Sequence, residues 1–217
     1  MDLPFTTEQF LEVFKTYNQA VFPAQIIFYV FAIYCIYSIF KPTRNTDRII
    51  NSILSFLWLW IGIVYHLNFF TNINKAAYVF GFLFIIQGLI FFISGVVKRN
   101  LSFAYKKDWI STAGFVFLLY ALIIYPVLGH LLGHQYPYSP TFGLPCPTTI
   151  FTFGLLLFTT KKISIWIIVI PLLWSFIGVS AAVNLSIYED IGLLIAGVSG
   201  LVLLIISNRN IVKNEPV

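Results

Sequence analysis

The residues of this chain best suited to chemistry are its three histidines. His130 and His134 are four positions apart, so both imidazoles share one face if a helix continues through them. Histidines at this spacing are a familiar pair of zinc ligands, and His66 from a neighbouring helix would supply a third. Three neutral imidazoles with an open fourth position lower the pKa of a zinc-bound water. The pattern therefore predicts a zinc site.

Cys146 and a set of polar residues are expected near the histidines. As a fourth ligand, Cys146 would close the zinc site instead of leaving a position for water. Three carboxylates are available as a general base: Glu8, Glu189 and Asp190. The other polar residues expected to line a cavity are Tyr65, Asn68, Asn72, Asn74, Tyr136 and Tyr138. Two simpler interpretations stay open, in which the histidines only hydrogen-bond to neighbours and Glu189 and Asp190 only cap a helix.

The elements that must position these residues are membrane spans. Hydrophobic residues make up 59% of the chain and charged residues 10%, against roughly a quarter charged in a soluble domain. We expect a single all-α transmembrane domain over residues 1–217, embedded in the lipid bilayer. Seven apolar runs predict seven transmembrane helices, at 23–40, 48–67, 76–97, 111–130, 147–160, 163–184 and 190–207.

The basic residues predict the orientation of these helices. Lys15 and Lys75 lie in one set of alternate gaps between the runs. The other set of gaps contains Lys41, Arg44, Arg48, Lys98, Arg99, Lys106, Lys107, Lys161, Lys162, Arg209 and Lys213. Because basic residues favour the cytoplasmic side, the N-terminus is expected outside and the C-terminus in the cytoplasm. No nucleic-acid-binding pattern accompanies the basic residues, so we interpret them as topology determinants and anionic-lipid contacts.

An amphipathic helix is expected before the first span, over residues 6–21. Thr6 and Gln9 form a capping box, and Phe10 and Phe14 belong to an apolar stripe at helical spacing. Such a helix lies at the membrane interface, here the outer one. It serves either as a simple anchor or as a lid over the mouth of the bundle.

The segment 134–147 is expected to enter the bundle. It contains no charged residue and four prolines, and the run that follows it, at 147–160, is short for a span. Irregular backbone within a membrane survives only when protein buries it or when it lines a wet cavity. We therefore expect a cavity open to the outside. Cys146 should react slowly with a membrane-impermeant thiol reagent, and faster after the substitution His130→Ala.

Several stretches resemble a family of bacterial multi-pass membrane proteins of unknown function. They include 3–10, Tyr65-His66, Ile73-Asn74 and most of 133–149, and the resemblance covers almost the whole chain. It implies the bacterial inner (plasma) membrane and no particular activity. A weaker similarity is to seven-helix zinc hydrolases that include alkaline ceramidases and adiponectin-type receptors, which use an early histidine and an HxxxH pair. In this chain the HxxxH pair closes the fourth span rather than the seventh.

These features predict an outward-facing, histidine-lined cavity that hydrolyses an amphiphilic or lipid-like substrate with zinc as cofactor. Two alternatives use the same cavity differently. One is a transporter or channel for a small solute, and the other is a metal- or ligand-binding membrane protein without turnover. A transporter needs a polar route inward. On the cytoplasmic side of Gln87 the spans offer few ionisable groups, which favours a one-sided site.

Overall fold

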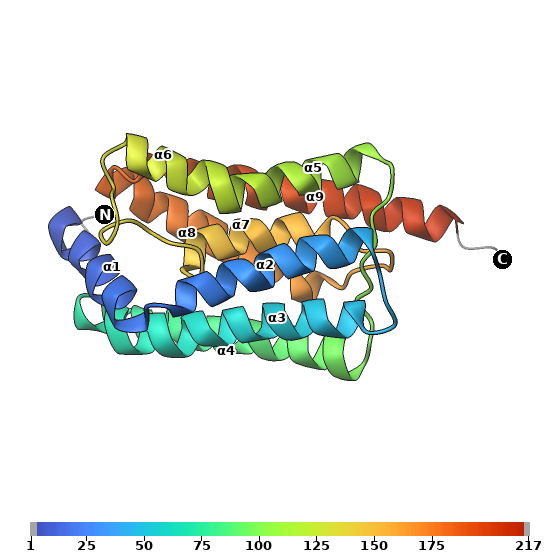
Figure 1. Ribbon diagram of the computed structural model, residues 1–217, viewed down its shortest axis with the longest axis horizontal. Helices are drawn as coiled ribbons and strands as arrows, with labels where there is room; N and C mark the ends of the chain where they lie inside the picture. The colour runs from blue at the N-terminus through green and yellow to red at the C-terminus, as the bar shows by residue number, and fades with distance from the viewer. Residues whose placement is uncertain (1–3, 215–217) are drawn as a thin grey trace.

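The computed structural model describes residues 4–214, and these are largely helical (Figure 1). The helices are α1 (Thr7–Val21), α2 (Ala24–Phe40), α3 (Thr46–Trp60), α4 (Ala77–Phe91), α5 (Trp109–Leu119), α6 (Tyr125–Leu131), α7 (Pro145–Leu156), α8 (Val169–Leu185) and α9 (Ile191–Asn214). π-helical turns extend α3 through Ile61–Phe69 and α4 through Phe92–Val97, and another at Tyr120–Ile124 joins α5 to α6. Between residues 4 and 214 only isolated bridges occur in place of strands, so the predicted all-α class is confirmed.

The lengths of the helices support a membrane protein. Within the described residues, five segments are long and apolar enough to cross a membrane: Thr46–Asn72, Ala77–Val97, Trp109–Leu131, Ile165–Leu185 and Tyr188–Lys213. Together α1 and α2 would add a sixth, although an 84° bend separates them. At 17 and 12 residues, α2 and α7 are the short members of the predicted seven. The count of seven spans therefore stays a prediction.

The short helix α7 lies at the centre of the bundle (Figure 1). Its residues from Pro147 to Leu156 are all buried, with α5, α8 and α9 packed around it. Twelve residues at about 1.5 Å each give about 18 Å, well below the roughly 30 Å of bilayer hydrocarbon. Because protein surrounds the helix, its length need not match the bilayer. It starts at Pro145, earlier than predicted, because proline fits the first turn of a helix.

Close contacts fix α7 in place. A Cβ atom added to Gly154 would lie 3.1 Å from the carbonyl oxygen of Gly114, so α5 and α7 approach each other through these two glycines. Small residues allow this kind of backbone approach in membrane bundles. On another side, the indole Nε1 of Trp58 in α3 donates a 3.0 Å hydrogen bond to Thr152 Oγ1.

Helix α1 lies across one end of the bundle, which we call the α1 end (Figure 1). The predicted capping box is present, because Thr6 and Gln9 exchange side-chain to backbone hydrogen bonds of 2.9 and 3.3 Å. Phe14 and Tyr17 are buried against the bundle, whereas Glu8 and Glu12 are exposed. The predicted amphipathic helix is confirmed.

Loops close the end opposite α1. Asp47 at the start of α3 accepts hydrogen bonds from Ser102 Oγ (2.7 Å) and the Phe103 amide (2.8 Å), and Lys106 Nζ donates to the Thr159 carbonyl at 2.8 Å. The loops after α2, α4 and α7 all lie here, as does the end of α9 (Figure 1). The alternate gaps that are rich in basic residues thus share one end of the bundle. Which end faces the cytoplasm stays a prediction.

Candidate functional site

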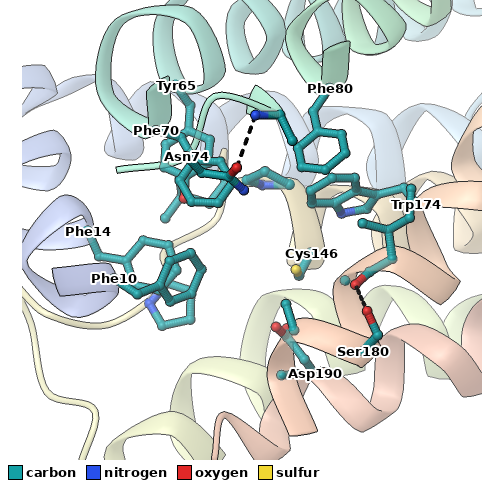
Figure 2. A pocket seen from close by; sticks show the side chains of 18 of the residues that line it. Phe10, Phe14, Tyr65, Phe70, Asn74, Phe80, Cys146, Trp174, Ser180 and Asp190 are labelled. Carbon is teal, nitrogen blue, oxygen red and sulfur yellow. Dashed lines mark hydrogen bonds between the residues drawn. The ribbon is translucent and has the colours of Figure 1, made fainter. Parts of the chain in front are cut away.

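A cavity of about 340 Å³ lies at the α1 end, between α1, the start of α4, α8 and the loop before α7. Six of the seven aromatic rings that line it form what we call the aromatic wall: Phe10, Phe14, Tyr65, Phe70, Phe80 and Trp174 (Figure 2). Pro140 and Leu144 from the loop also line the cavity. The predicted insertion of segment 134–147 is therefore found in part, because its second half is buried beside the cavity whereas Gln135, Tyr136 and Tyr138 are exposed.

Asp190 and Cys146 form the polar floor of the cavity, where they face each other (Figure 2). The hydroxyl of Tyr125 donates a 2.5 Å hydrogen bond to Asp190 Oδ1. Asp190 is 6% exposed, so its carboxyl lies well below the surface of the protein. Cys146 is the second residue of α7, so the N-terminus of the central helix begins at this floor.

Asn18 ties α1 to the loop that covers the cavity. Its side chain is fully buried and donates to the carbonyls of Pro137 (2.7 Å) and Ser139 (2.8 Å). Thr141 Oγ1 donates to its Oδ1 at 2.8 Å, and Gln25 from α2 donates to its carbonyl at 2.9 Å. Phe10 and Phe14 reach the cavity from the same helix. Of the two roles considered for α1, the geometry favours the lid.

The two histidines of the HxxxH motif do not share a helix face. Helix α6 ends at Leu131, and Gly133 adopts a positive φ of 96° that turns the chain away. The His134 amide donates back to the Gly129 carbonyl at 2.8 Å, which is the six-residue closure of a glycine-terminated helix. The predicted i, i+4 pair is therefore wrong. His130 remains on α6 and is exposed.

His134 instead pairs with a carboxylate. Its Nδ1 lies 2.8 Å from Glu189 Oε1, and the Glu189 side chain is fully buried. Tyr120 donates to the Glu189 carbonyl at 2.8 Å. Glu189 and Asp190 lie in the short turn directly before α9, where the helix dipole favours negative charge. Their side chains also bond to Tyr125 and His134, so the two residues do more than cap a helix.

His66 is enclosed by aromatic rings. It is fully buried, and neither ring nitrogen has a hydrogen-bond partner in the described structure. Its ring centroid lies 4.8 Å from that of Phe84 and 5.3 Å from that of Trp174. Residues 4–214 contain no group of three or more His, Cys, Asp or Glu that could hold a metal ion. The structure thus does not bring together the four candidate zinc ligands, His66, His130, His134 and Cys146.

Two of the four predicted cavity residues in the segment 65–74 line the cavity, namely Tyr65 and Asn74. Asn72 borders a separate hollow on the other side of α1. Asn68 donates to the Ile63 carbonyl at 2.7 Å, within its own helix. Proximity in sequence to His66 therefore identified only two of these four residues correctly as lining the cavity.

The remaining candidates lie outside the cavity. Tyr136 and Tyr138 are 55% and 40% exposed, and the Lys15 ammonium lies 5.2 Å from the centroid of the Tyr138 ring. Glu8 is exposed in the first turn of α1, where a hydrogen bond from Thr6 lowers the pKa of its carboxyl. Neither its position nor its pKa suits a general base for chemistry in the cavity.

Sequence reasoning missed half of the aromatic wall. Trp174, Phe70 and Phe80 are single aromatic residues in apolar segments, and aromatics make up 18% of this chain. Tyr125, which holds Asp190, gave no signal either. Tyr65 was predicted beside His66, and Phe10 and Phe14 stood out because they lie on the apolar face of an otherwise polar helix.

Comparison with other proteins gives a family and no activity. No curated protein and no solved structure matches the chain. Residues 7–214 match a family of unknown function, DUF6064, which is nearly the whole length. The chain therefore belongs to this family of unknown function (DUF6064).

Proposed function

We propose that the protein is a membrane receptor that binds a small apolar or amphiphilic molecule in the cavity at its α1 end. The cavity itself carries the proposal. Its volume of about 340 Å³ falls within the range of small-molecule pockets, and its lining is mainly aromatic and aliphatic. Two polar groups, Cys146 and Asp190, face each other on the floor. Ligand sites commonly combine these two features.

The packing below the floor favours binding from one side over transport. α7 begins at the floor, and its residues from Pro147 to Leu156 are buried on every face. Phe151 and Phe153 are among the fully buried side chains of this helix. A solute could pass only if the central helix moved. A pocket that opens only at the α1 end can bind its ligand without movement of this helix.

A zinc hydrolase receives less support. The hypothesis needs His66, His130 and His134 around one ion, but these residues are respectively enclosed by rings, exposed and paired with Glu189. A catalytic zinc site needs three protein ligands around one ion. We therefore favour binding without metal-dependent turnover.

The proposed setting is the bacterial plasma membrane, with the α1 end outside. This orientation rests on the basic loops at the opposite end, since such loops favour the cytoplasm. A ligand would then enter from the external medium or the outer leaflet, beneath α1.

Filling the cavity tests the proposal. Ala181 lines the cavity, whereas Val183 on the same helix is 61% exposed and does not. Phenylbutanol, an uncharged aromatic alcohol, should raise the melting temperature of the protein in nanodiscs because it binds only the folded state. We expect Ala181→Phe to abolish this rise and Val183→Phe to retain it. Two results would contradict the proposal. One is a melting temperature of the natural protein that phenylbutanol does not change at any soluble concentration, and the other is an equal rise in both variants.

A further inference from the structure

We infer that the ligand carries an ammonium group, either an amine or a quaternary ammonium, which Asp190 and the aromatic wall hold together. This inference rests on the proposed function and adds the chemical class of the ligand. Three separate observations lead to it: the charge of the lining, the rings around it and the composition of the α7 N-terminus.

The charge of the lining favours a cation. Among the described residues that line the cavity, Asp190 is the only one with an acidic or basic side chain. The two ion pairs found in residues 4–214 join Lys15 to Glu12 and His134 to Glu189, so neither includes Asp190. A buried carboxylate is costly unless a counter-charge accompanies it. The hydrogen bond from Tyr125 is neutral, so a ligand cation would supply the missing charge.

The aromatic wall suits the same ligand. The faces of aromatic rings attract ammonium groups, and tryptophan is the best of them. Phe10 and Phe14 pack with ring centroids 4.6 Å apart on one side of the cavity, and Phe80 and Trp174 lie 5.5 Å apart on the other. Figure 2 shows both pairs around the space above Cys146 and Asp190. Aromatic cages of this kind recognise quaternary ammonium compounds.

The N-terminus of α7 offers little to an anion. A helix N-terminus normally binds anions through its free backbone amides. Here Pro145 and Pro147 have no N–H, and the Thr148 amide already donates to the Leu144 carbonyl at 3.3 Å. Asp190 at the same floor would also repel an anionic group. The site is therefore poor for carboxylates and phosphates.

Cys146 provides a reporter inside the cavity. The other cysteine, Cys35, is fully buried in α2 and can be removed as Cys35→Ala. In that background we would compare two membrane-impermeant methanethiosulfonates, one trimethylammonioethyl and one sulfonatoethyl, each rate normalised to its rate with a free small thiol. The ratio of the two rates cancels the reactivity of the thiol. We expect the cationic reagent to label Cys146 about tenfold faster or more, because a buried carboxylate attracts it and repels the anion.

A substitution and a competition complete the test. Asp190→Asn keeps an acceptor for Tyr125 and removes the charge, so the rate ratio should fall close to one. Benzyltrimethylammonium should protect Cys146 at concentrations about tenfold lower than benzyl alcohol does. Asp190→Asn should weaken the protection by benzyltrimethylammonium and leave the protection by benzyl alcohol unchanged. If Asp190 had a purely structural role, Asp190→Asn would change the protection by the two compounds equally.

The outcomes separate this inference from the proposed function. A rate ratio near one in the protein with its natural Asp190, or equal protection by the two compounds, would overturn the ammonium assignment and leave ligand binding intact. Failure of both compounds and of phenylbutanol to bind would overturn the proposed function as well. If the Asp190→Asn variant does not fold, the rate ratio measured with Asp190 present still decides whether the ammonium assignment holds.

Discussion

The two histidines of the HxxxH motif differ in what their loss should cost. His134→Ala removes the partner of a fully buried Glu189, and an unpaired buried group costs about 1–3 kcal/mol. We expect a clear fall in the melting temperature in detergent. His130→Ala, at an exposed position four residues earlier, should leave the melting temperature nearly unchanged. Equal effects of the two substitutions would mean that the histidines act together, as a shared metal site requires.

The residues of the site could be predicted from the sequence only in part. Cys146, Asp190, Tyr65 and Asn74 were among the predicted residues and line the cavity. The histidines were misplaced because Gly133 ends α6, and a glycine after a periodic run is a known stop signal that spacing alone ignores. The assembly of the aromatic wall could not be predicted, since it depends on packing between distant segments.

Asn18 should control access to the cavity, because it links α1 to the covering loop through three side-chain hydrogen bonds. Asn18→Ala leaves the carbonyls of Pro137 and Ser139 without this donor. We expect Cys146 to react several-fold faster with an impermeant thiol reagent, and the protein to lose about 1–3 kcal/mol of stability. Glu12→Gln on the exposed face of α1 is the control, since its ion pair with Lys15 is exposed and contributes little.

The same measurement corrects an expectation about His130. The sequence suggested that His130→Ala would speed the labelling of Cys146, but His130 is exposed on α6 and does not line the cavity. We now expect no change. A marked acceleration in His130→Ala would show that α6 covers the cavity in place of α1.

Among the elements, α1 and the spans follow directly from local signals. The capping box, the apolar runs and the charges between them need no tertiary information. The central position of α7 is different. Its shortness was visible in the sequence, but burial on all sides depends on how α5, α8 and α9 pack around it. Sequence periodicity does not report that packing, because most of these helices are apolar all round.

At the level of the whole protein, the difference between the two ends of the bundle links the fold to the proposed function. The α1 end contains the cavity and its lid, whereas the opposite end is closed by loops rich in basic residues. The alternation of charge predicted this division. The side of the membrane that each end faces is what determines where a ligand would come from.

Sided labelling of Cys146 tests the central claim most directly. In the Cys35→Ala background, an impermeant thiol reagent would be applied to right-side-out and to inverted membrane vesicles, with and without phenylbutanol. We predict labelling only in the right-side-out vesicles, slow at first and slower still when phenylbutanol occupies the cavity. Labelling only in inverted vesicles would reverse the orientation. Rapid labelling that phenylbutanol does not reduce would contradict the covered binding cavity itself.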